Sequence, residues 1–440
     1  MLSLRSIALS FIAALTVLSS GVSDAKPLKV FILVGQSNMQ GQADQSTLAG
    51  MAMDPEAKPL YDKLVDKDGK PRVHENVYIA DFSGGGGSKG KPITSTEKHG
   101  KLTVGWGADF SSPEPTKVGP ELAFGVTMYE NLKEPILLIK TSWGGKSLKL
   151  NFRPPSGGPY YEHPEEVKDR ISHKGEKITA ASQVAEKEKD TGVFYRLMMK
   201  DVQAVLADPG KYCPAYNPKE GYELAGFFWF QGFNDLIGDY PKIDPSKGGG
   251  TDYSEYSRLL ACLIRDVRKE LSAPKLPFVI GVMGIGGKTA EQGMMQFRQA
   301  MAAPAAMPEF KGNVIAVETA PFWDEKLQEL QERKALMHGD SKKKKRGGDD
   351  SNDKYADLRK KIAPLQKELD ALHEKPGNNR GKVKEILKKM EDIVFTPEDQ
   401  EYIAKNQSNA GFHYLGSAKT YSRIGEACAK AIVEMNNTRE

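Results

Sequence analysis

The stretch VFILVGQSNMQGQAD, from Val30 to Asp44, changes character in its middle. Its first five residues are apolar and suit a strand buried on both faces of a parallel sheet. Gly35 follows, and then come Gln36, Ser37 and Asn38, which are polar or turn-forming. We expect the strand to end in a tight turn that exposes Ser37 at the carboxyl end of a sheet, where ligands bind in α/β proteins.

Four more short apolar runs occur along the chain, at Pro135–Ile139, Leu224–Phe230, Phe278–Val282 and Asn313–Val317. Between them the spacing of apolar residues predicts helices over 120–131 and 253–271, and a closing helix over 418–435. Strands that alternate with helices predict a three-layer α/β/α sandwich with a mostly parallel sheet.

The first 25 residues resemble an export signal. Arg5 supplies a positive charge, Ile7 to Leu18 form an apolar run, and Ser23-Asp24-Ala25 matches a cleavage site with small residues. We therefore expect a periplasmic or extracellular protein, although an uncleaved N-terminal anchor has the same composition. No later segment has the roughly 20 consecutive apolar residues of a membrane span.

Composition excludes several classes of function. A formal charge of +4 on 440 residues gives no reason to expect nucleic acid as a partner. The three cysteines, Cys213, Cys262 and Cys428, allow at most one internal disulfide. The chain contains no CxxC motif or paired Cys/His cluster, so we expect no structural metal site.

Residues 325–395 interrupt the α/β pattern, and we expect the sandwich domain to comprise 26–324 and 396–440. Two apolar stripes at helical spacing, split by the turn-like KPGNNRG (375–381), predict a helical hairpin. Pro364 should kink the first helix or mark its first turn. The run SKKKKRGGDDSND (341–353) reads as a solvated loop, or as a contact to an anionic polysaccharide or membrane surface.

Unusual polar groups follow three of the predicted strands. KTSWGGKSL comes after 135–139, and QGFNDL comes after 224–230. If these loops converge with the Ser37 turn, the backbone N–H groups of Ser37 and Gly145 and the side-chain amide of Asn234 would face one point. A nucleophile that faces three hydrogen-bond donors is what acyl transfer through a tetrahedral oxyanion needs.

A serine nucleophile also needs a base, and the chain has seven histidines. Five fall in segments that read as polar loops or as part of the helical insertion: His99, His163, His173, His338 and His373. His74 precedes a possible strand, far from the carboxyl end of the sheet. His413, in the glycine-punctuated NAGFHYLGSAKTY before the closing helix, is the best candidate for the general base.

Four blocks together resemble a known superfamily. GQSNM near the N-terminus, a GG block, WFQGFND and a late histidine are similar to the blocks of SGNH hydrolases, whose sandwich is flavodoxin-like. Within that superfamily the chain most resembles the carbohydrate esterases grouped with sialate O-acetylesterases, the carbohydrate esterase family 6 type. The resemblance covers roughly residues 28–324 and 396–436 and leaves the helical insertion outside.

The resemblance implies a role for each matching residue. It makes Ser37 the nucleophile and His413 the base, with Ser37, Gly145 and Asn234 as the oxyanion hole. Gln36 and Gln231 match positions that line the site, where they support it or touch substrate. No metal or organic cofactor is implied.

Two positions depart from the family pattern. Ala410 stands where the family has an aspartate three residues before the histidine, with Asn409 beside it. Either a Ser-His dyad operates with a backbone carbonyl holding the imidazole, or an acid arrives from elsewhere, with Asp235, Glu318 and Asp324 as candidates. Phe233 stands where related chains often have glutamate, so the sugar preference could differ.

The sequence thus predicts a serine esterase that removes acetyl or other small acyl groups from an extracellular polysaccharide or glycan. Aromatic residues near the blocks would stack on sugars or belong to the core: Trp106, Trp143, Tyr160, Tyr161 and Trp229. For Trp229, inside an apolar run, the core is the better interpretation. The rival hypotheses are a non-catalytic carbohydrate-binding protein on the same fold and a lipid esterase of the same superfamily.

Overall fold

A seven-stranded sheet forms the centre of the protein in the computed structural model, which describes residues 26–84, 93–160, 167–172, 174–338, 354–373 and 379–438. The strand order is β11-β10-β9-β1-β6-β3-β4. The strands are β1 (Leu28–Gly35), β3 (His74–Ser83), β4 (Thr96–Leu102), β6 (Ile136–Ser142), β9 (Tyr222–Phe230), β10 (Phe278–Val282) and β11 (Val314–Glu318). Every neighbouring pair is parallel except β3 with β4, so the mostly parallel sheet expected from the sequence is confirmed.

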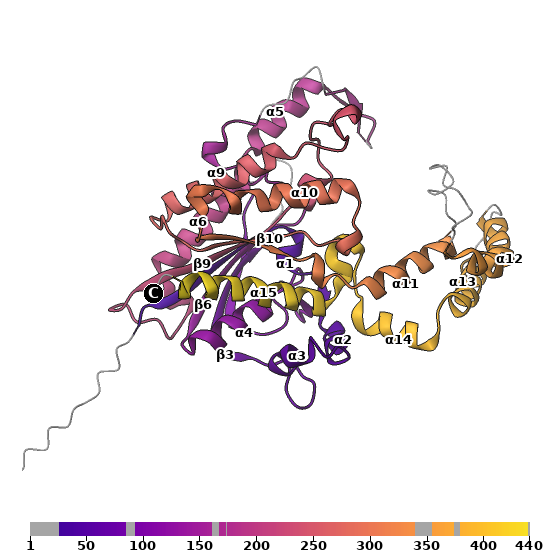
Figure 1. The fold of residues 1–440 in the computed structure, drawn as a ribbon, viewed down its shortest axis with the longest axis horizontal. Coiled ribbons are helices and arrows are strands. Elements are labelled where there is room, and N and C mark those ends of the chain that lie inside the picture. Colours follow the sequence, from indigo (N-terminus) through magenta and orange to yellow (C-terminus); the bar gives the residue numbers. More distant parts are fainter. Residues whose placement is uncertain are drawn as a thin grey trace, which may run out of the picture.

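β1 lies at the middle of this sheet and is buried on both faces. Val30, Ile32 and Val34 belong to one hydrophobic core, whereas Phe31 and Leu33 belong to the other. The first core is covered by α6 (Val193–Ala207), α9 (Ser254–Glu270) and α10 (Gln292–Ala302). The second is covered mainly by α4 (Glu121–Leu132) and α15 (Ala418–Asn437), as Figure 1 shows. This is the three-layer sandwich, and the strand alternates between the two cores because its side chains alternate between faces.

The remaining elements are short or peripheral. The other helices are α1 (Ser37–Gln40), α2 (Ala49–Ala52), α3 (Lys58–Leu64), α5 (Ala180–Asp190), α7 (Pro209–Tyr212), α8 (Phe233–Leu236), α11 (Glu325–Ala335), α12 (Ala356–His373), α13 (Arg380–Val394) and α14 (Pro397–Asn406). β2 (Ala43–Asp44) pairs with β5 (Lys117–Val118), and β7 (Arg170–Ile171) pairs with β8 (Lys177–Ile178). Both short pairs are antiparallel.

Two elements were not expected from the sequence. His99 lies in β4, an edge strand, and not in a polar loop. β4 reads TEKHGKL and lacks the apolar alternation of a half-buried strand because it pairs on one side only and most of its residues are at least partly exposed. The second is α5, in the segment 149–193, which is rich in Gly, Pro, Lys and Glu; none of the side chains of α5 is buried. Without a buried face, neither element leaves a hydrophobic period to detect.

The helices α11 to α14 extend to one side of the sandwich (Figure 1). α12 and α13 form the expected helical hairpin and share a third apolar core, which includes Ile362, Leu369, Ile386 and Met390. Pro364 lies well inside α12 rather than in its first turn. Its exposed position lets water reach the carbonyl group that its missing N–H leaves without a helical partner.

Four further predictions concern the export signal, the basic run, membrane spans and disulfides. The export signal (1–25) and the basic run (341–353) lie outside the described residues. Among the helices that the structure describes, none is long and apolar enough to cross a bilayer. All three cysteines are buried and free, so no disulfide forms.

Candidate functional site

Ser37 lies at the carboxyl end of the central strand, as the first residue of α1. Gly35 is required just before it, because a Cβ at this position would lie 2.1 Å from the carbonyl oxygen of Phe230 on β9. Gly41 ends the turn with φ of 89°, a backbone conformation that favours glycine. Glycines on both sides therefore allow the tight strand-to-helix turn predicted around the serine.

The GG block lies next to this turn. It follows β6, which pairs with β1 so that Ser142 is beside Gly35. A Cβ added to Gly144 would lie 3.7 Å from the Cβ of Ser37. Gly145 has φ of 72°, and no atom lies within 4 Å of the position that its Cβ would take. The structure thus brings the GG block next to Ser37 through Gly144 and leaves the space beside Gly145 open.

Gln36 and Gln231 join the Ser37 turn to the QGFND block. The Nε2 of Gln231 donates to the Oε1 of Gln36 at 3.1 Å and to the carbonyl oxygen of Lys146 at 2.9 Å. The same Oε1 accepts longer contacts from the backbone N–H groups of Gly232 and Asn234, each at 3.4 Å. All three loops expected to carry the site therefore meet through these two buried glutamines.

Asp235 completes this junction and has no hydrogen bond to a histidine among the described residues. Its carboxylate accepts hydrogen bonds from the backbone N–H groups of Leu148 and Lys149, at 2.7 and 2.9 Å. It also accepts from Gln231 at 2.7 Å and from the Tyr240 hydroxyl at 2.9 Å. Four donors account for this buried carboxylate, which holds the loop after Gly145 against the QGFND block.

The other two candidate acids also lack a link to His413. Asp324 accepts from the backbone N–H of Leu327, where it caps α11, and forms an ion pair with Lys419 at 2.8 Å. Glu318 is exposed at the end of β11, and burial of part of the carboxyl group raises its pKa. None of the three acids considered from the sequence orients the imidazole.

His413 lies on a strained loop, residues 411–416, directly before α15. Tyr414 and Leu415 have φ of 50° and 59°, which costs free energy for residues other than glycine. Both side chains are buried, and the N–H of Leu415 donates to the carbonyl of Ala410 at 3.0 Å. Packing and hydrogen bonds therefore hold the strained backbone in one conformation.

Asn38 and Tyr421 connect this loop to the Ser37 turn. The Nδ2 of Asn38 donates to the carbonyl oxygen of Phe412 at 3.2 Å, and the Tyr421 hydroxyl donates to the Oδ1 of Asn38 at 2.8 Å. The same hydroxyl contacts the carbonyl oxygen of His413 at 3.3 Å. The residue after Ser37 thus anchors the histidine loop, a role that the sequence motif did not reveal.

The imidazole of His413 has one hydrogen-bond partner among the described residues, the Oδ1 of Asn409, which lies 3.1 Å from Nδ1. Burial, together with the positive charge of Lys117, lowers the pKa of His413 to about 4. No hydrogen bond joins His413 to the Ser37 hydroxyl within the described parts of the chain. Catalytic hydrogen bonds are often long or poorly aligned before substrate binds and tighten only in the complex with substrate.

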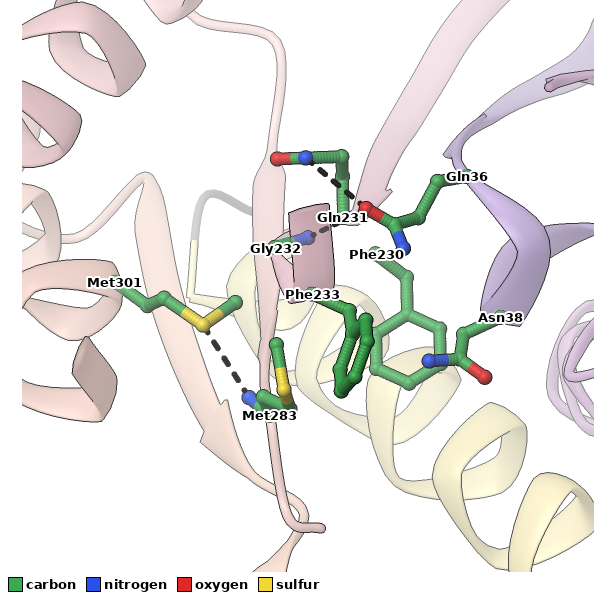
Figure 2. Close-up of a pocket in the computed structure, with 8 residues that line it drawn as sticks. All are labelled: Gln36, Asn38, Phe230, Gln231, Gly232, Phe233, Met283 and Met301. Atoms are coloured by element: carbon green, nitrogen blue, oxygen red, sulfur yellow. Dashed lines mark hydrogen bonds between the residues drawn. The ribbon is translucent and has the colours of Figure 1, made fainter. Parts of the chain in front are cut away.

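A small pocket opens beside the Ser37 turn, and Figure 2 shows its lining. The walls come from the ends of β1, β9 and β10 and from α1, α8 and α10: Gln36, Asn38, Phe230, Gln231, Gly232, Phe233, Met283 and Met301. Its empty volume is about 190 Å³, including the open side. The Nε2 of Gln36 is buried without a hydrogen-bond partner among the described residues. The pocket is therefore mainly apolar, with an unpaired donor at its edge.

Two phenylalanines lie over the site, whereas the tryptophans do not. The rings of Phe233 and Phe412 are 5.6 Å apart, and Phe412 is 44% exposed. Trp106, Trp143 and Trp229 are all buried in the cores, so they cannot stack on a sugar. Tyr160 is also buried, and Tyr161 lies outside the described residues.

A buried charge cluster contacts the end of the Ser37 turn and was not expected from the sequence. Lys140 on β6 is fully buried and lies 3.1 Å from Glu121 and 3.2 Å from Asp81. Its ammonium group also donates to the carbonyl oxygen of Gln40 at 2.9 Å. The only signal in the sequence is a lysine that directly follows the apolar run of a strand.

Comparison with protein families decides the classification. The model of a family described as "carbohydrate esterase, sialic acid-specific acetylesterase" matches residues 27–356, which is most of the chain. The chain belongs to this family. The match includes the Ser37, Gly145 and Asn234 blocks and ends before His413. The family resemblance stated from the sequence is thus confirmed, and the chain is a carbohydrate esterase by family.

Two solved structures resemble this family member. One is a protein from Arabidopsis thaliana, with 18% identity and a TM-score of 0.34 over 67% of this chain and 86% of that one. The other is a carbohydrate acetylesterase from Xanthomonas citri, with 13% identity and a TM-score of 0.35 over 66% of this chain and 49% of that one. Such low TM-scores decide neither fold nor activity. The comparison with curated proteins gave no match.

Proposed function

We propose that the protein is a serine esterase that removes acetyl groups from an acetylated polysaccharide or glycan outside the cytoplasm. The observation that carries the proposal is the convergence of three loops at the carboxyl end of the sheet, where Gly144 of the GG block lies close to Ser37 and Gln36 contacts both Gln231 and the N–H of Asn234. Membership of a carbohydrate esterase family supports the substrate class.

The proposed mechanism has two steps. The Ser37 hydroxyl attacks the acetyl carbonyl carbon while the Nε2 of His413 accepts its proton. The N–H groups of Ser37 and Gly145 and the side-chain amide of Asn234 stabilise the oxyanion. The sugar hydroxyl leaves with the proton from His413, and water then hydrolyses the acetyl-enzyme by the same sequence. No step requires a metal or organic cofactor.

The low pKa of His413 predicts activity in mild acid. A base must be neutral to accept a proton, and burial with the nearby Lys117 keeps this imidazole neutral down to a pH of about 4. The acidic limb of kcat/KM should therefore lie near pH 4, well below the usual histidine value of about 6.5. A profile of the acetate-release rate from about pH 3 to about pH 9 measures the position of this limb. A limb at the usual value would contradict the proposed role of burial.

The pocket beside Ser37 is the proposed site for the acyl group. Its lining is mainly apolar, which suits the methyl group of an acetyl ester. Phe230, Phe233 and Met283 would contact the acetyl methyl group. Gln36, with its unpaired Nε2, is the better candidate for substrate contact, since Gln231 already donates to Gln36, Lys146 and Asp235.

Enlarging this pocket should broaden the acyl preference. Phe233→Ala removes one wall, so butyryl esters should gain about tenfold relative to acetyl esters, because each buried methylene contributes about 0.8 kcal/mol. The ratio of kcat/KM for 4-nitrophenyl butyrate and acetate measures the change. Phe412→Ala is the matched control, since the Phe412 ring contacts Phe233 at a tilt but does not line the pocket. An equal change in both variants would contradict the pocket assignment.

Two rival functions make different predictions. A non-catalytic carbohydrate-binding protein would leave Ser37 unlabelled by a fluorophosphonate probe, whereas the proposed esterase would be labelled at Ser37. A lipid esterase would release long-chain acids faster than acetate. An acetate-release screen on acetylated xylan, pectin and sialic acid, run beside long-chain esters, separates these functions and identifies the sugar. Phe412, which is exposed, and the half-buried Phe233 beside it are the proposed surface for the sugar ring.

A further inference from the structure

The hydrogen bond between Asn409 and His413 determines which nitrogen of the imidazole carries the proton. Amide oxygen and nitrogen atoms are distinguished by their partners, and a backbone N–H can only donate. The N–H of Ala410 donates to one terminal atom of Asn409 at 2.8 Å, so that atom is the oxygen. The same oxygen lies 3.1 Å from the Nδ1 of His413.

An oxygen in this position accepts only, so Nδ1 must carry the proton. In a neutral imidazole the proton on Nδ1 leaves Nε2 as the free acceptor. This is the tautomer that a general base needs in a serine hydrolase, where a carboxylate normally stabilises it. Here the amide of Asn409, four residues before His413, occupies the position of that carboxylate.

We infer that Asn409 is the positioning residue for His413 and replaces the missing aspartate, so that the site works as a serine-histidine-asparagine arrangement. The inference rests on the proposed esterase function. The loop favours such a role because it fixes the asparagine as firmly as the histidine. The N–H groups of Ser408 and Asn409 both donate to the carbonyl of Leu415 at 3.0 Å, and that of His413 donates to the carbonyl of Ala410.

An amide differs from a carboxylate in one respect, since it does not stabilise a positive imidazolium by charge. The charged or titratable groups that lie close to the loop include Lys117 of β5, Asp44 of β2 and Tyr421 of α15. Besides burial, the positive charge of Lys117 lowers the pKa of His413. Asp44 is occupied by Ser46 and Thr116, and the Tyr421 hydroxyl by Asn38 and the carbonyl of His413. Asn409 thus fixes the tautomer without favouring the charged form.

Three variants of the full chain test this inference. Asn409→Ala should lower kcat by about a hundredfold with KM changed less than about twofold, because the substrate contacts remain. Asn409→Asp should restore most of kcat and move the acidic limb of the pH profile upward by about one unit or more, since a carboxylate favours the imidazolium. Ser408→Ala is the control: its hydroxyl ties the same loop to Gly416 at 2.8 Å without touching the imidazole, so kcat should stay near the native value.

A direct readout comes from the nitrogen chemical shifts of the His413 ring, assigned by comparison with His413→Ala. The native protein should show the tautomer with Nδ1 protonated, and Asn409→Ala should lose it. The Ser37→Ala protein should still show it, so this result is independent of esterase activity. Native kcat in a folded Asn409→Ala protein, an unchanged tautomer in that variant, or the same losses in Ser408→Ala would overturn the inference. A fully active Ser37→Ala protein would instead overturn the proposed function.

Discussion

Replacing Ser37 with alanine is expected to lower the rate of acetate release by at least about a thousandfold, the usual effect of losing the nucleophile of a serine hydrolase. The hydroxyl forms the covalent bond in the proposed mechanism, and no neighbouring group can substitute for it. Initial rates on 4-nitrophenyl acetate and on the best substrate of the acetate-release screen measure the loss.

The structure indicates that this variant will fold. The turn around Ser37 depends on Gly35, Gly41 and the side chain of Asn38, and none of these changes. Its melting temperature should therefore equal that of the native protein. Ser257→Ala, which removes a hydroxyl bonded to Ala300 on the α9 side of the sandwich, is the matched control and should keep full activity. Undiminished hydrolysis by purified Ser37→Ala would refute the proposed mechanism.

Lys140→Met is expected to lower the free energy of unfolding by about 3–5 kcal/mol, the cost of leaving buried charges without their partner. The lysine lies between Asp81 and Glu121, and all three side chains are fully buried. Burial already raises the pKa of Asp81 to about 7, which shows how strongly the site disfavours an unpaired carboxylate. Urea denaturation monitored by tryptophan fluorescence measures the loss.

The pH dependence of this loss has a definite sign. Without Lys140, the two carboxyl groups will be protonated in the folded state at a higher pH than in the unfolded chain. Stability is then retained at low pH and falls as the pH rises through the folded pKa values. The variant should therefore lose less free energy of unfolding at about pH 5 than at about pH 8, on either side of the pKa of about 7 for Asp81.

Two further variants identify the cause. Adding Asp81→Asn and Glu121→Gln to Lys140→Met removes the unpaired charges and should recover much of the stability. Lys63→Met breaks an exposed ion pair with Glu130 and should cost no more than about 1 kcal/mol. A small loss in Lys140→Met, or no recovery in the triple variant, would show that the buried charge is not what makes the lysine important.

The order of the elements could be predicted from sequence because it depends on local patterns. The apolar runs of β1, β6, β9, β10 and β11 and the helical spacing of α4, α9 and α15 were all visible, since burial on both faces of a sheet requires such runs. β4 and α5 were missed because strands at an edge and helices without a buried face carry no such pattern.

The motifs around Ser37, Gly145 and Asn234 were readable for a different reason: a turn at the end of a strand needs glycine and polar residues in a fixed order. The sequence alone therefore determined the five strands with apolar runs, the turn that exposes Ser37, and the family. It could not determine which groups hold the turn and the histidine. Asn409, Asn38 and Lys140 acquire their contacts from residues distant in sequence or from an irregular loop. Only the tertiary structure decides such contacts, because hydrogen bonds depend on distances between atoms that chain order does not specify.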